Sequence, residues 1–154
     1  MGYGNKNVSL INTGEKYILW KIRPEFYYII NPNRKTLKYF ALEAFYIDHT
    51  EEFTTQSFFD EQNNYRRFNK ADYNRIKMGL VPKFGMFINL SRSIGLNIYT
   101  GVGIRYRINT YDNFVDLRQG TINEEHFSPY FRNEGSKIGV EFTFGTKLYY
   151  RLKS

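Results

Sequence analysis

The chain has 154 residues, a length typical of one domain, and its 22 basic and 15 acidic residues give a formal net charge of +7. No apolar run of about 18 residues occurs, which excludes a transmembrane helix. Aromatic residues, nearly all Tyr and Phe, make up 19% of the chain, and both types favour strands and membrane interfaces. Cysteine is absent, which fits an exported protein that avoids stray disulfides.

The N-terminal part of the chain is predicted to contain one clear strand. Residues 1–15 are polar and rich in Gly and Asn, so we expect a loop or a strand remnant there, and no signal peptide is visible. Apolar side chains recur at alternate positions over residues 16–30, as in an extended strand. Pro24 removes one ladder donor, so a bulge or an edge is expected at that point. A turn is predicted at residues 31–35.

Four further strands are predicted along the rest of the chain. They cover residues 37–47, 73–90, 94–108 and 135–153, and the last keeps its alternation for about fifteen residues, beyond the 9–11 that a tilted strand needs to cross a bilayer. Short turns alternate with long polar stretches at 48–72 and 109–134. Outer-membrane barrels of the up-and-down type show this alternation of short turns and long loops.

The polar face of the predicted strands carries glycine interleaved with charged side chains. Glycine weakens a strand exposed to solvent but makes room for long neighbours inside a narrow barrel. Three glutamates on this face are expected to pair with the surrounding bases, because a buried unpaired charge is costly. The predicted lumen charge network consists of Lys21, Arg23, Glu25, Glu43, Lys83, Arg105, Arg107, Glu141, Lys147 and Arg151.

The opposite face of the same strands is apolar, with almost no charge and no glycine. Trp and Tyr lie towards its ends, as in the aromatic girdles of a membrane interface. The predicted lipid-facing side chains are Trp20, Ile22, Phe26, Phe84, Met86, Ile98, Val102, Ile104, Val140, Phe142, Phe144 and Leu148.

The pattern over roughly residues 16–153, seen best in 94–107 and 138–152, resembles small bacterial outer-membrane β-barrel proteins of the OmpA/OmpX-like type. The resemblance implies an all-β, antiparallel up-and-down (meander) barrel that contacts the lipid bilayer or lipopolysaccharide. It also implies a structural or adhesion-like role through stretches 48–72 and 109–134, with no enzymatic activity and no cofactor. A lumen filled with side chains argues against a general porin. Because such barrels have an even number of strands, at least eight, we expect strands to be missing before residue 16.

Other interpretations remain open. A soluble barrel would turn the apolar face inward around a hydrophobic ligand. Two His-carboxylate clusters lie around His49 and His126. One interpretation is a shared metal site, but we favour the other, in which both clusters belong to solvated polar loops. A hydrolase site of Asp116, His126 and Ser128 is a second alternative. We expect no nucleic-acid binding, because the strands are long and their apolar face is mainly aliphatic.

Overall fold

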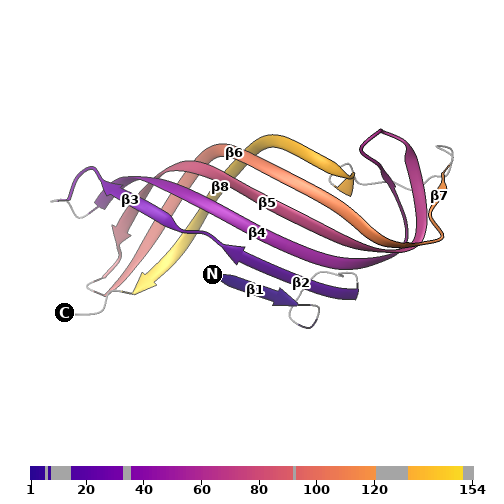
Figure 1. Ribbon diagram of the computed structural model, residues 1–154. Helices are drawn as coiled ribbons and strands as arrows, with labels where there is room; N and C mark the ends of the chain where they lie inside the picture. The colour runs from indigo at the N-terminus through magenta and orange to yellow at the C-terminus, as the bar shows by residue number, and fades with distance from the viewer. Residues whose placement is uncertain (6, 8–14, 33–35, 92, 121–131, 151–154) are drawn as a thin grey trace. The chain divides into compact units, whose positions relative to one another are not determined.

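The computed structural model describes residues 1–5, 7, 15–32, 36–91, 93–120 and 132–150, which form one antiparallel sheet (Figure 1). The strands are β1 (Gly2–Asn5), β2 (Glu15–Ile22), β3 (Glu25–Ile29), β4 (Thr36–Phe59), β5 (Tyr65–Asn89), β6 (Ile94–Val115), β7 (Arg118–Gln119) and β8 (Gly135–Tyr150). Within these residues there is no helix with the length and apolar character needed to span a membrane.

The sheet is a meander in the order β1-β2-β4-β5-β6-β8, so the predicted all-β antiparallel meander is confirmed. At Pro24, where a bulge or an edge was expected, the strand divides into β2 and β3. Both pair with β4 in one continuous register, from Ile22↔Tyr46 to Glu25↔Glu43, so there is no bulge at this point. A strand remnant exists near the N-terminus, where β1 pairs with β2 in the register Tyr3↔Trp20.

The sheet has two edges. Among the residues that the structure describes, β1 pairs only with β2 and β8 pairs only with β6. The sheet is therefore open in this part of the chain, and its closure into a barrel stays a prediction.

The prediction of a long loop at residues 48–72 is wrong. β4 continues to Phe59 and β5 begins at Tyr65, so a tight turn joins two strands of 24 and 25 residues. The Asp60 carboxylate fixes this turn by accepting hydrogen bonds from the backbone N–H groups of Gln62 (3.0 Å) and Asn64 (2.7 Å). Such turns are typical of Asp and Asn. Alternation of polar with apolar residues is weak here because charged and aromatic side chains share one face.

Part of the stretch at residues 109–134, which was predicted to be a loop, also belongs to strands. β6 continues to Val115, and β7 pairs with the start of β5 through Arg66↔Gln119. β8 begins at Gly135, where the last strand was expected. Residues 121–131 and 151–154 lie outside the described residues.

The contacts divide the chain into two compact units. Unit 1 comprises Met1–Ile22, Tyr46–Met78 and Tyr106–Ile138, and unit 2 comprises Arg23–Phe45, Gly79–Arg105 and Gly139–Ser154. The long strands β4, β5, β6 and β8 contribute residues to both units.

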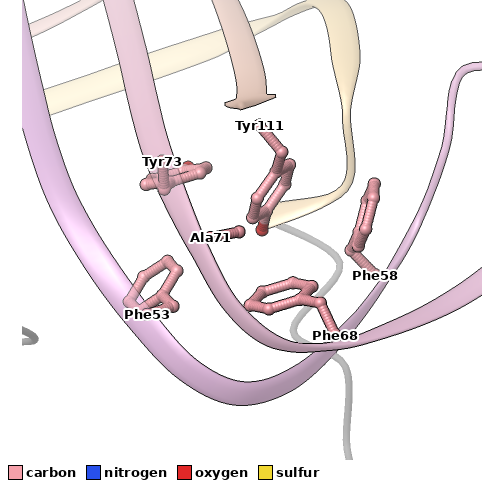
Figure 2. Close-up of a cluster of buried hydrophobic side chains, with 6 residues drawn as sticks. All are labelled: Phe53, Phe58, Phe68, Ala71, Tyr73 and Tyr111. Carbon is pink, nitrogen blue, oxygen red and sulfur yellow. The ribbon is translucent and has the colours of Figure 1, made fainter. Parts of the chain in front are cut away.

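Unit 1 has a core of aromatic side chains, which Figure 2 shows facing one another from β4, β5 and β6. Phe58 stacks on Tyr111 with ring centroids 4.3 Å apart. The members of this aromatic cluster are Phe53, Phe58, Phe68, Ala71, Tyr73 and Tyr111, with Phe114 packed against them. Both units also bury charged side chains, Glu51, Glu52 and Arg107 in unit 1 and Glu43 and Lys83 in unit 2.

Candidate functional site: a buried charge cluster

Unit 2 contains a cluster of ion pairs on the polar face of the sheet. We call it the charge cluster, and it consists of Arg23, Glu25, Glu43, Lys83 and Lys147. Glu25 comes from β3, Glu43 from β4, Lys83 from β5 and Lys147 from β8, and Arg23 precedes β3. The alternation of each strand places these side chains on the same face.

Lys83 is the centre of the charge cluster. Its Nζ lies 2.8 Å from Oε1 of Glu25 and 2.8 Å from Oε2 of Glu43. The side chains of Lys83 and Glu43 are each only 3% exposed. Ions so deeply buried are tolerated only when their partners compensate for lost hydration. The two carboxylates around one ammonium group supply that compensation.

Two further cations complete the cluster. Arg23 donates to Oε1 of Glu43 from both Nη2 (2.6 Å) and Nε (3.1 Å). Lys147 donates to Oε1 of Glu25 over 3.2 Å. Tyr27 also donates its hydroxyl hydrogen to Glu25. Each carboxylate thus has at least two charged partners, and three bases face two acids.

Tyr99 on β6 supplies the remaining contact. The Nζ atoms of Lys83 and Lys147 lie 4.6 Å and 5.0 Å from the centre of its ring, within cation–π range. Contacts therefore run from Glu25 to Lys83, Tyr99, Lys147 and back to Glu25. The strands β3, β4, β5 and β8 each contribute a member of the charge cluster, and β6 contributes Tyr99. Side chains therefore fill the polar face of unit 2 in this region.

Glycines on the polar face make room for these large side chains. A Cβ atom at Gly101 would lie 2.8 Å from Cγ of Lys83, and one at Gly145 would lie 2.8 Å from the Tyr99 hydroxyl. A third, at Gly139, would lie 3.0 Å from the Arg105 guanidinium. These close approaches account for glycine in strand interiors, where it otherwise weakens the sheet.

The other members of the predicted charge network lie in different places. Arg105 and Glu141 form a separate ion pair of 3.1 Å in unit 2. Lys21 and Arg107 belong to unit 1, where Arg107 is 6% exposed. Arg151 lies outside the described residues. The structure thus brings five of the predicted residues together in the charge cluster and two more in the second pair.

The apolar face has the opposite character. Of the twelve side chains predicted to face lipid, all but the partly buried Met86 are exposed, and Phe142 and Phe144 reach 73% and 84%. A hollow of about 540 Å³ opens between β5, β6 and β8 and is lined mainly by apolar side chains, among them Phe84, Ile98 and Phe144. These exposures describe the chain alone, and contact with lipid stays a prediction.

The aromatic cluster of unit 1 was not predicted from the sequence. Hydrogen bonds anchor its surroundings: Tyr111 donates to the backbone oxygen of Arg132 over 2.7 Å, and Asn109 donates to that of Asn133 over 2.7 Å. The Arg132 guanidinium lies 4.4 Å from the centre of the Phe53 ring. The available signal was the recurrence of Phe and Tyr within the polar stretches 48–72 and 109–134.

Unit 1 also holds an ion-pair group in which two exposed lysines contact the buried carboxylate of Glu52. Lys16 and Lys70 each place Nζ within 3.0 Å of a Glu52 carboxylate oxygen. Their hydrogen bonds hold the pKa of Glu52 below its usual value near 4.5. Burial, reinforced by the neighbouring Glu61 carboxylate, raises the pKa of Glu134.

The alternative sites gain little from the geometry. Nε2 of His49 lies 3.1 Å from Oε2 of Glu51, and among the described residues no group of three or more metal-ligating side chains is found. His126 and Ser128, which the hydrolase hypothesis requires, lie outside the described residues. Asp116 accepts a hydrogen bond of 2.7 Å from Asn69.

Comparison of the chain with protein-family models, with curated proteins and with solved structures gives no match.

Proposed function

We propose that the chain is a membrane-embedded β-sheet protein of the outer-membrane barrel type, similar to OmpA/OmpX-like proteins, with a structural or surface-interaction role and no enzymatic activity. The observation that carries this proposal is the distribution of side chains in unit 2. Ion pairs are buried on one face of its strands, while large apolar side chains are exposed on the other. Membrane barrels have this arrangement, with a polar interior and an apolar exterior.

The exposed apolar face would be costly in water. Burial of one large apolar side chain stabilises a protein by about 1.5–3 kcal/mol, yet Phe142, Phe144 and Leu148 are all at least 73% exposed. Large contiguous apolar patches are rare on soluble monomers and mark contact surfaces. Lipid acyl chains would cover this face, and the hollow beside Phe144 suits one of them.

The same distribution argues against a soluble barrel that holds a hydrophobic ligand. Such a barrel would place its apolar side chains around the ligand and its charges in solvent. In unit 2, Lys83 and Glu43 are buried whereas Val102 and Phe142 are exposed. The side chains that meet at the charge cluster also support a filled interior over a general porin.

Unit 1 supports the second part of the proposal, a role at the water-facing surface. Its strand residues 48–59 and 65–75 carry acidic and basic side chains together with the aromatic cluster. A firmly packed hairpin of this composition would present a rigid polar surface to partners outside the hydrocarbon. The proposed location is the bacterial outer membrane, with the bilayer or lipopolysaccharide as the contacting phase.

A matched pair of substitutions on one strand tests the proposal. Val102 in unit 2 and Val115 in unit 1 both lie on β6 and are 53% and 49% exposed. Arginine on a lipid-facing site near the bilayer centre costs about 2–4 kcal/mol, whereas water-exposed sites tolerate it. We therefore expect Val102→Arg to reduce insertion into lipid vesicles strongly and Val115→Arg to leave it near the wild-type level.

Insertion is measured as the fraction of protein that floats with the vesicles. Folding is measured as the difference in gel mobility between boiled and unboiled samples. Equal insertion of the two arginine variants would contradict the proposal. So would a folded wild-type monomer in plain buffer without detergent, since its apolar face would then tolerate water.

A further inference from the structure

We propose that β8 pairs along its free edge with β8 of a second copy of this chain, antiparallel, with the two-fold axis passing through Phe144. β8 is 16 residues long, and its only partner among the described residues is β6. A long unpaired edge presents a row of free backbone N–H and C=O groups that can pair with another strand. The sequence of β8 shows which strand fits it.

Charge complementarity identifies the partner as a second copy and also sets the register. When Phe144 of one copy lies opposite Phe144 of the other, Glu141 lies opposite Lys147 on both sides of the axis. The two residues are six positions apart, so their side chains share a face of the strand. Opposite charges placed directly across an antiparallel pair stabilise it.

Neighbouring registers lose this match. Centring the axis on Thr143 would place Glu141 opposite Gly145, and centring it on Gly145 would place Glu141 opposite Tyr149. A register centred on Gly139 would place Glu141 opposite Lys137, but it would align only residues 135–143 of β8, whereas the register centred on Phe144 aligns residues 138–150.

The remaining cross-strand neighbours in this register are compatible. Val140 lies opposite Leu148 and Ile138 opposite Tyr150, so the apolar face continues across the axis. Gly139 lies opposite Tyr149, and an aromatic ring across from a glycine compensates for the missing side chain. A two-fold interface of this kind uses the same surface on both copies.

The existing contacts of the two charged residues do not prevent the pairing. Glu141 already accepts from Arg105 and Lys147 already donates to Glu25. A carboxylate offers about four acceptor positions and an ammonium group three donors, so each can hold a second partner. The Lys147 side chain is also 49% exposed.

The inference does not rest on the membrane proposal, and in it β8 of a second copy takes the position that a closing strand of the same chain would occupy in a barrel. In lipid, a free strand edge leaves backbone groups unsatisfied and does not occur within the hydrocarbon. Pairing through β8 would remove one such edge from each copy. In water, the same pairing would cover part of the apolar face.

Single-cysteine cross-linking tests the register directly, because the chain contains no cysteine. Directly opposed residues of an antiparallel pair have Cα atoms about 4.5–5.5 Å apart, within disulfide range. We expect Phe144→Cys, refolded in micelles and oxidised, to give at least about tenfold more disulfide-linked dimer than Ile104→Cys. Ile104 is the matched control, since it is 67% exposed on β6, which has strands on both sides.

A second set of variants checks the register. Val140→Cys alone should not cross-link, because its two copies would lie about 27 Å apart along the strands. A mixture of Val140→Cys and Leu148→Cys should give the heterodimer. Charge reversal by Glu141→Lys should lower the Phe144→Cys dimer yield, and the added change Lys147→Glu should restore it.

Two outcomes would overturn the inference. One is equal cross-linking of Phe144→Cys and Ile104→Cys, which indicates random collision. The other is the absence of a Phe144→Cys dimer while Val102→Arg still blocks insertion. In that case another strand covers β8 and the membrane proposal stands, so the two failures are distinguishable.

Discussion

Lys147 on β8 donates a hydrogen bond of 3.2 Å to Glu25 on β3, although β4, β5 and β6 lie between these strands in the sheet. In a flat sheet, strands about 4.8 Å apart would place β3 and β8 roughly 19 Å from each other, too far for two side chains to meet. Unit 2 therefore curls around its polar face. This curvature brings side chains from β3, β4, β5 and β8 together in the charge cluster and places Tyr99 of β6 against it.

The first prediction concerns the centre of the charge cluster. Lys83→Met keeps the aliphatic length of the side chain but removes the cation between Glu25 and Glu43. Removing one partner of a buried pair costs about 3–5 kcal/mol, and we expect the lower end because Arg23 and Lys147 still contact the carboxylates. The loss would be measured as the free energy of unfolding by denaturant in detergent micelles.

Lys147→Met is the matched control for that experiment. Its side chain is about half exposed, and exposed ion pairs contribute only about 0–1 kcal/mol. If the two variants lost the same stability, the special role assigned to Lys83 would be wrong.

The charge cluster shows how far the sequence could predict this structure. Alternation placed Glu25, Glu43, Lys83 and Lys147 on one face, and glycines on the same face indicated crowding. The pairing of particular residues was not predictable, because it depends on strand register and curvature. Arg105 and Glu141 illustrate this, since they form their own pair apart from the other members.

The hairpin around Asp60 shows the opposite case, in which the sequence misled. Residues 48–72 lack a continuous apolar face, so periodicity predicted a loop there. Backbone pairing between β4 and β5 does not require apolar side chains, and Phe53, Phe58 and Phe68 supply enough contacts on one side. The sequence signal for this hairpin was the pair Asp60 and Asn64, because Asp and Asn favour turns and the Asp60 carboxylate accepts a hydrogen bond from the Asn64 N–H group.

The second prediction tests the close approach at Gly101. A Cβ atom there would lie 2.5 Å from the backbone oxygen of Pro82, 2.8 Å from Cγ of Lys83 and 3.1 Å from Cγ2 of Thr143. Overpacking of this kind costs about 1–3 kcal/mol, so Gly101→Val should lower the midpoint of thermal unfolding. Thr100→Val is the control, because Thr100 is the adjacent residue on the exposed face and has room for the change. Comparable destabilisation by both changes would argue against crowding on the polar face.

The third prediction concerns the aromatic cluster of unit 1. Phe58 is 1% exposed and packs on Tyr111 and Phe114. Truncation of a buried phenylalanine to alanine costs about 3–5 kcal/mol, so Phe58→Ala should accelerate amide hydrogen exchange in residues 108–115 of β6. Phe142→Ala, at an exposed site of unit 2, should leave exchange in that segment unchanged. Exchange that stays slow in Phe58→Ala would show that the cluster does not hold unit 1 together.

The fourth prediction concerns the response of unit 1 to acid. Hydrogen bonds from Lys16 and Lys70 lower the pKa of Glu52, so the unfolded state holds this proton more tightly than the folded state. The resulting stabilisation is fully present above the usual pKa near 4.5 and is lost as the pH falls through the lowered value. Glu52→Gln should therefore flatten the acid limb of the stability profile, measured by chemical denaturation at pH 3 to 7.

Glu134 should respond with the opposite sign and serves as the control for that profile. Burial, with the nearby Glu61 carboxylate, raises its pKa, so the folded state holds the proton more tightly. The wild type then loses stability as the pH rises from about 4.5 through the raised value. Glu134→Gln should remove this loss and make unit 1 less sensitive to pH in that interval. Glu52→Gln should thus make the slope of stability against pH less positive, and Glu134→Gln should make it less negative. If both substitutions changed this slope with the same sign, the environments assigned to the two carboxylates would be incorrect.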